Sequence, residues 1–338
     1  MNQNKTIDFY SGIFDWGNYS GSERKKKYVF EGITYMVKFP DPVREIHNLL
    51  SYMNNQYSEY VGCHIYESLN IPVQETYLGK YVNNGREIVA VACRDFKNDG
   101  LELYPLKYIQ SGDISSSSDF LGNLTITKLY EVIHSLGNAE LESKTINHFW
   151  TMFIVDYLIG NYDRHLENWG MAIDQNGRRM PSPVYDCGSS LLPLYSDDEL
   201  EVLVKQKLFN GICLNVNTPF FDEVTGRRVI FREVFESPNQ DLKKAILEVF
   251  PKISLAKIYQ IIQETPFMSD VRKTAMIESM KIRYNQVLLK SFVQIKYPEL
   301  SSHEQSRLIS SMKSNSSASL REVGYTPQIR NKSFSHER

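Results

Sequence analysis

The first hundred residues repeat apolar side chains at every second position, which is the period of a β-strand. Residues 27–30 and 33–39 predict a hairpin around a Glu-Gly turn, and a proline follows it. Residues 73–81 and 87–93 predict a second hairpin around an Asn-Asn-Gly turn. The last of these strands ends in the continuous apolar run Ile-Val-Ala-Val-Ala-Cys, which is typical of a buried central strand.

The strand at 33–39 carries a lysine on the face opposite its aromatic residues. Tyr35 lies on one face and Lys38 on the other. Apolar residues recur every fourth position over 57–69, which predicts a helix with Glu59 in its first turn. An acidic residue there interacts favourably with the helix dipole. The same carboxylate is also placed to pair with Lys38, and both interpretations stay open.

A glycine-containing segment precedes these strands. Residues 8–23 alternate aromatics with serines and glycines, and they predict a strand-turn-strand whose backbone can approach a ligand closely. The segment lacks both the Gly-x-Gly-x-x-Gly and the Walker pattern. A flexible hairpin is an equal alternative.

The second part of the chain changes to helical periodicity. Residues 124–136 and, more clearly, 145–160 predict helices, and the second keeps its apolar side chains in the i, i+3, i+4 pattern. Ser143 or Thr145 is available as its N-cap, and Gly160 ends it. Because this helix is so apolar, we expect it to be buried and to form a rigid support for the polar segment that follows it.

Three further helices are predicted over 239–250, 255–262 and 268–293, and the last is long and amphipathic. Residues 97–123 predict irregular structure. From residue 301 the composition shifts to Ser, Asn, Lys and Arg, which is typical of a flexible tail.

Together these patterns predict an α+β fold with two lobes, of the protein-kinase-like kind. A small β-rich N-lobe spans 1–96, with a hinge at about 92–96. A larger α-helical C-lobe spans 97–300, and the polar tail spans 301–338.

Composition narrows the choice of partners. The 338 residues are 42% hydrophobic, enough for two lobes, and the net charge of -2 argues against nucleic acid or an anionic membrane as a partner. The four cysteines are widely spaced, which indicates reduced thiols rather than a zinc site or disulfides. A polar N-terminus without an apolar signal core predicts a cytoplasmic protein, with export as an effector the alternative.

The residues that carry chemistry follow the apolar helix. Asp163 and Asn168 stand five apart in a polar octet, and Asp186 opens an Asp-x-Gly turn after an intervening hairpin. Phosphoryl transfer uses such a set, because one carboxylate orients the attacking hydroxyl while an amide and a second carboxylate hold magnesium. The protein-kinase signature has the same Asp-to-Asn interval and then Asp-Phe-Gly, whereas Cys187 stands here in place of the phenylalanine.

Each motif alone also has an ordinary explanation. Asp-x-Gly is a common turn, and a lysine at a strand end is usually exposed to solvent. The kinase interpretation depends on the order of these motifs along the chain. As in a kinase, the chain has in turn a glycine turn, a lysine strand, a glutamate helix, a hinge, a catalytic loop and a metal loop.

Longer stretches resemble the HipA-like serine/threonine kinases over about residues 8–295. The stretches concerned are Tyr35 to Pro40, Ser58 to Val61, Ile159 to His165 with Asn168, and Val184 to Asp186. The chain has no room before its sheet for the additional N-terminal subdomain of full-length HipA. It is more similar to the short members, including HipT-type toxins and the cell-translocating kinase A group.

The resemblance implies an ATP- and Mg2+-dependent protein serine/threonine kinase. Asp163 would be the catalytic base, and Asn168 and Asp186 would bind magnesium. Lys38 would contact the ATP phosphates, with Glu59 as its partner.

Further nucleotide contacts are implied less directly. His165 would lie near the phosphates, or would make only a structural hydrogen bond in the loop. The remaining candidates for nucleotide binding are Gly17 and Gly21 in the glycine turn and Ala92, Arg94 and Phe96 in the hinge. Autophosphorylation is expected at Ser20 or Ser22, where the added negative charge would disfavour nucleotide binding.

Two other functions stay open. Asp-Arg-His-x-x-Asn also resembles the catalytic loop of phosphoinositide kinases, so the acceptor is alternatively a lipid or small molecule. A nucleotide-binding module without turnover, working as an interaction protein, is the third possibility. For a protein kinase the expected partners are a protein substrate and an antitoxin or other regulator, with no direct nucleic-acid or membrane binding.

Overall fold

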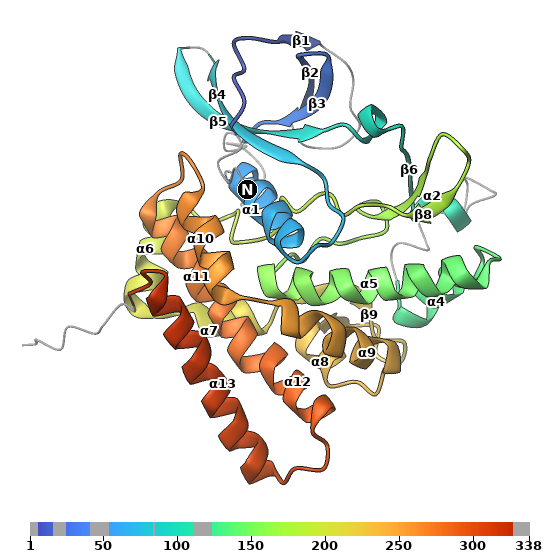
Figure 1. The fold of residues 1–338 in the computed structure, drawn as a ribbon, viewed down its shortest axis with the longest axis vertical. Helices are drawn as coiled ribbons and strands as arrows, with labels where there is room; N and C mark the ends of the chain where they lie inside the picture. Colours follow the sequence, from blue (N-terminus) through green and yellow to red (C-terminus); the bar gives the residue numbers. More distant parts are fainter. Residues whose placement is uncertain (1–5, 16–24, 41–53, 84, 111–123, 327–338) are drawn as a thin grey trace, which may run out of the picture.

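The computed structural model describes residues 6–15, 25–40, 54–83, 85–110 and 124–326. A β-sheet lies at one end of the molecule and a group of helices at the other, with α1 beneath the sheet (Figure 1). The strands and helix of the first part are β1 (Ile13–Asp15), β2 (Lys25–Phe30), β3 (Ile33–Lys38), α1 (Asn55–Ser68), β4 (Thr76–Asn83) and β5 (Arg86–Arg94). This α+β, two-lobed arrangement is the predicted one.

The two hairpins form as the alternation predicts. The described strands make an antiparallel sheet in the order β1-β2-β3-β5-β4, with Tyr28 opposite Tyr35 between β2 and β3. Tyr35 and Val37 pack with Tyr28 and Phe9 on the outer face of the sheet. Lys38 leaves the same strand on the other face, toward α1.

The connection after β5 is more ordered than predicted. It contains the short helix η1 (Phe96–Asp99), β6 (Glu102–Pro105) and α2 (Lys107–Gln110). Strand β6 pairs with β7 (Gly170–Ile173), which in turn pairs with β8 (Arg179–Pro181). The sequence predicted irregular structure here because β6 is too short for its alternation to be read.

The long helix α5 (Ala139–Ile159) is the centre of the helical part, next to α4 (Ile126–His134). It begins earlier than predicted, because Asn138 rather than Ser143 or Thr145 is its N-cap and accepts a hydrogen bond from the Leu141 amide at 2.9 Å. Its first turns are polar, so the apolar period did not mark them. Its other end is as predicted, with Gly160 in the left-handed conformation at φ 70°.

The remaining elements are α6 (Asp197–Gln206), α7 (Phe209–Leu214), β9 (Asn217–Phe221), β10 (Arg228–Ile230), α8 (Phe231–Phe235), α9 (Gln240–Val249), η3 (Phe250–Lys252), α10 (Leu255–Glu264), α11 (Asp270–Arg283), the π-helical turn η4 (Tyr284–Leu288), α12 (Leu289–Lys296) and α13 (Ser302–Glu322). Of these, α8, α9 and α12 lie on the side of α5 away from the sheet, whereas α10 packs beside α1 (Figure 1). The part between residues 97 and 300 is therefore not wholly helical, since it also holds two small sheets.

The described part of the tail that was predicted to be flexible, residues 301–326, is largely a helix. Ser301 and Glu304 form a capping box at the start of α13, and the helix packs against α10 and α12. Leu320 and Tyr325 are buried at its far end. A narrow apolar stripe on an otherwise polar helix is enough for this docking, and overall composition conceals such a stripe. In the described part of the chain, no helix combines the length and the apolar character that a membrane crossing requires.

Candidate active site

Lys38 is held between two carboxylates from distant parts of the chain. Its Nζ lies 2.8 Å from a Glu59 oxygen and 2.7 Å from an Asp186 oxygen. Lys38 is only 2% exposed and Glu59 is fully buried. A buried ammonium is tolerated only when anions compensate it, so these contacts fix the lysine in the space between sheet and helices.

Glu59 also holds the loop that follows Asp186. Its second carboxylate oxygen accepts a hydrogen bond from the Cys187 backbone amide at 3.0 Å. Gly62, one turn further along α1, allows this approach, since a Cβ there would meet the Cys187 Cβ at 2.7 Å. Helix α1 starts two residues earlier than predicted, which places Glu59 beyond its first turn. The dipole interpretation of this carboxylate therefore does not apply.

Asp186 combines a strained backbone with a stable negative charge. Its φ of 59° is in the left-handed region, which costs a non-glycine residue of the order of 1 kcal/mol or more. Burial raises the pKa of Asp186, but the ion pair with Lys38 outweighs it and leaves the pKa at about 2. The side chain stays 27% exposed, so an ionised oxygen faces the open space.

The loop after α5 brings Asp163 and Asn168 together. The Asn168 side-chain amide donates to the Asp163 carbonyl at 2.8 Å, and its backbone amide donates to the His165 carbonyl at 2.9 Å. The Asp163 backbone amide donates in turn to the Asn161 side chain at 3.3 Å. The conformation of the octet is therefore set by its own asparagines.

The Asp163 carboxylate is partly exposed and electrically coupled to its surroundings. Loss of solvent raises the pKa of Asp163, His165 opposes this rise, and Asp186 adds to it. His165 Nε2 lies 3.8 Å from an Asp163 oxygen, while Nδ1 accepts a hydrogen bond from the Glu167 amide at 3.2 Å. That second bond makes Nε2 the protonated nitrogen of the neutral ring.

The buried Arg164 connects these two loops. Its guanidinium pairs with Asp156 of α5 at 2.8 Å. It also donates to the Asn168 carbonyl at 2.7 Å and to the Tyr185 carbonyl, next to Asp186. Arg164 was not among the residues predicted to form the site. The sequence does contain one signal, Asp156, because a carboxylate within the apolar half of α5 requires a cationic partner.

Three comparisons bear on this geometry. The profile of the HipA-like C-terminal domain family matches residues 20–218. The serine/threonine-protein kinase CtkA of Helicobacter pylori is 33% identical over 294 residues, which cover 84% of this chain and 86% of the relative.

The chain belongs to the HipA-like kinase family. It is a protein kinase, with the nucleotide and divalent-metal dependence that kinases share. The crystal structure of the Helicobacter pylori proinflammatory kinase CtkA superposes with a TM-score of 0.72 at 28% identity, over 87% of this chain and 100% of that one. HipA of Shewanella oneidensis, solved with HipB and operator DNA, reaches 0.41 at 15% identity over 76% of this chain and 60% of that one, too little for an argument.

The structure of this HipA-like kinase brings some predicted site residues together and leaves others apart. Lys38, Glu59, Asp186 and the Asp163 loop form one cluster. Ala92 does not join it, because its side chain packs on the outer face of the sheet.

The hinge candidates differ among themselves. The Arg94 side chain pairs with Glu75 and Asp99, and its backbone amide donates to the Glu75 carbonyl at 2.9 Å. Arg94 is therefore engaged within the protein and away from the cluster. Phe96 contacts Tyr185 edge-on, one residue before Asp186, and so lies at the border of the site. Gly17, Gly21, Ser20 and Ser22 fall outside the described residues.

Proposed function

We propose that this kinase transfers the γ-phosphate of ATP to a serine or threonine hydroxyl of a protein. The observation that carries the proposal is the position of Lys38, held by Glu59 and Asp186 beside the Asp163 loop. Phosphoryl transfer is catalysed mainly by positioning and charge stabilisation, and such a cation serves both.

Asp186 and Asn168 are the residues that would hold Mg2+. The Asp186 carboxylate has a pKa of about 2 and remains partly exposed, so it offers an ionised oxygen at neutral pH. The Asn168 amide donates its hydrogen to the Asp163 carbonyl, which leaves its oxygen as the ligand atom. Both are the hard oxygen ligands that magnesium prefers. The metal, when bound, would neutralise charge on the triphosphate.

Asp163 would accept or orient the proton of the attacking hydroxyl. The loop is held mainly through backbone atoms and Asn161, and the Asp163 side chain is 41% exposed. Its carboxylate, which accepts a long hydrogen bond from Ser189 at 3.5 Å, can therefore face an acceptor. His165, 3.8 Å away, would influence the charge of this carboxylate. Its contact with nucleotide phosphates stays a prediction.

Labelled ATP and a lysate separated into protein and lipid fractions test the acceptor class. The wild-type kinase should label protein, and Asp163→Asn should remove that label while the variant keeps its melting temperature. Label confined to the lipid fraction would reject the protein acceptor. Calorimetric ATP binding without transfer to any acceptor would instead favour a module without turnover.

We also propose that autophosphorylation regulates the kinase. Autophosphorylation at Ser20 or Ser22 would place a doubly charged group in the segment expected to cover ATP, and so disfavour nucleotide binding. Mass spectrometry of the purified protein before and after incubation with ATP tests this. An antitoxin or other regulatory partner, and a cytoplasmic location, likewise stay predictions.

A further inference from the structure

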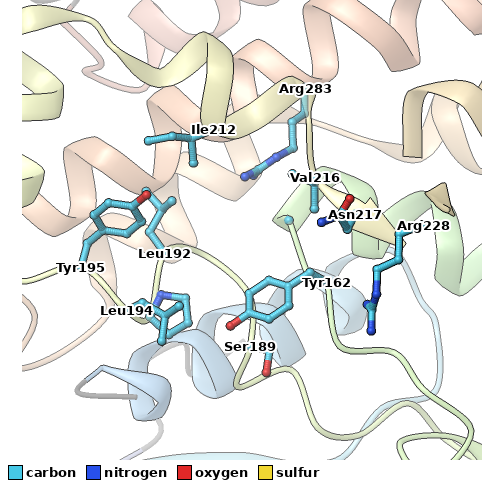
Figure 2. Close-up of a pocket in the computed structure, with 12 residues that line it drawn as sticks. Tyr162, Ser189, Leu192, Leu194, Tyr195, Ile212, Val216, Asn217, Arg228 and Arg283 are labelled. Carbon is cyan, nitrogen blue, oxygen red and sulfur yellow. The ribbon is translucent and has the colours of Figure 1, made fainter. Parts of the chain in front are cut away.

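A pocket of about 330 Å3 opens beside the candidate catalytic carboxylate. Tyr162, which precedes Asp163, and Ser189 both line it, and the Ser189 hydroxyl lies 3.5 Å from an Asp163 oxygen. The other lining residues come from the segment after Asp186, from α7, from the β9–β10 hairpin with the residue before it, and from the C-terminal ends of α5 and α11 (Figure 2). The pocket therefore adjoins the atoms where an acceptor hydroxyl would bind.

The charge of this pocket is one-sided. Its lining contains two arginines, Arg228 and Arg283, and no acidic residue. The other walls are mainly apolar, with Leu192, Leu194 and Ile212 among them. Such a lining suits an aliphatic stem that ends in a negative charge.

Arg283 is the residue that points to a ligand. It is 2% exposed, yet no carboxylate of the described residues forms an ion pair with it, and its Nε has no hydrogen-bond partner there. Its one described bond is from Nη1 to the Leu158 carbonyl at 3.3 Å. A buried charge without a counter-ion is costly, and an anion entering the pocket would supply one.

The space around this guanidinium is also unusual. A Cβ on Gly160 would overlap the Arg283 guanidinium, so any larger residue there would displace the end of the arginine side chain. Gly160 has φ 70° as well, which favours glycine for a second reason. In Figure 2 the Arg283 guanidinium points toward the space between Ile212 and Tyr162.

We infer that the pocket binds an anionic side chain of the acceptor polypeptide, close in sequence to the serine or threonine that is phosphorylated. Aspartate, glutamate and a phosphorylated residue share the required chemistry. Arg283 would bind the anion and Arg228, at the exposed edge, would attract it. The inference rests on the proposed function, because it assigns a substrate class to the same site.

The test measures binding, so that it does not depend on turnover. Fluorescent peptide pools with a central alanine in place of serine carry glutamate, glutamine or phosphoserine at the flanking positions, and anisotropy gives their dissociation constants. The wild-type kinase should bind the glutamate or phosphoserine pool about tenfold or more tightly than the glutamine pool. Comparison of the two anionic pools, with inorganic phosphate as competitor, separates carboxylate from phosphate recognition.

Variants assign the preference to one residue. Arg283→Gln should bind all pools as weakly as the glutamine pool, and Arg283→Lys should recover part of the preference because it restores the charge. Arg307→Gln on α13 removes one exposed arginine away from the pocket and should change nothing. Melting temperatures of all variants accompany the titrations.

Two results would overturn the inference. One is equal binding of glutamate and glutamine pools by the wild type, and the other is a preference that survives in Arg283→Gln. A purely structural role for Arg283 would lower the melting temperature and weaken all pools alike. Failure of the proposed function would appear elsewhere, as transfer of phosphate to no protein in the labelled-ATP assay.

Discussion

Two buried cations border the candidate catalytic loop, and they are compensated differently. Lys38 and Arg283 are each 2% exposed. Lys38 has two carboxylates within 2.8 Å, whereas Arg283 has none among the described residues. A cation that carries its own counter-ions is part of the finished structure. A buried cation without counter-ions keeps an uncompensated desolvation cost, which an anionic ligand can reduce.

The largest effect is expected from the carboxylate between these two regions. Asp163→Asn keeps the shape of the side chain but removes its charge, so kcat for phosphate transfer should fall about 10²- to 10⁴-fold. ATP affinity, measured by calorimetry, should stay near the wild-type value because the Lys38 side of the site is untouched. A kcat within a few-fold of wild type would reject Asp163 as the base.

Lys38→Met tests the compensated cation. Glu59 would be left buried and Asp186 partly buried without their counter-ion, which should cost about 3–5 kcal/mol of unfolding free energy in urea titrations at neutral pH. The cost should shrink as the pH falls through the range where the freed carboxylates protonate, since the low pKa of Asp186 depends on Lys38.

The double variant Lys38→Met with Glu59→Gln is the matched control for that measurement. It removes one of the two stranded charges, so part of the lost stability should return. Unfolding free energies of all three proteins that agree within error would show that the triad contributes nothing to folding.

Arg283→Met tests the uncompensated cation and should have a much smaller effect on stability. The variant loses one hydrogen bond, to the Leu158 carbonyl, but also the penalty of an unpaired buried charge. The unfolding free energy should change by less than about 1 kcal/mol in either direction. A loss as large as that of Lys38→Met would mean that Arg283 is compensated in the folded protein.

The smallest effect concerns pH. Because desolvation raises the pKa of Asp163, the acid limb of kcat/KM should lie above the ordinary pKa of an aspartate, and activity should fall as the pH drops through it. His165 lowers that pKa, so His165→Gln should move the limb to higher pH, by less than about one unit. A limb that stays in place would exclude His165 from the charge balance.

Local patterns predicted the compensated region well. The alternation of residues in β3 was enough to predict that Lys38 and Tyr35 lie on different faces of that strand. The apolar period of α1 predicted that Glu59 lies on a helix, from which it could face Lys38. These residues lie on regular elements, where the direction of a side chain follows from its position in sequence. In the folded protein, Lys38 therefore contacts Glu59 at 2.8 Å and Asp186 at 2.7 Å.

The second region was beyond the reach of such patterns. Arg283 is the last residue of α11, in a segment whose sequence is that of an ordinary amphipathic helix. What distinguishes it is burial without a counter-ion in the described part of the chain, beside Gly160, more than a hundred residues earlier, and only the fold brings these two residues together. The small strands β6, β9 and β10 were missed because three to five residues are too few to show a period. Helix α13 was missed because its apolar stripe is narrow.

The Glu59 carboxylate joins three parts of the molecule. One oxygen of this carboxylate faces the Lys38 ammonium and the other accepts the Cys187 amide, so a single side chain fastens sheet, helix and turn. Withdrawal of α1 by little more than a hydrogen-bond length would release both contacts in the same movement. Lys38 would keep its direct contact with Asp186 at 2.7 Å, so the position of α1 sets how firmly the lysine and the Asp186 turn are held together.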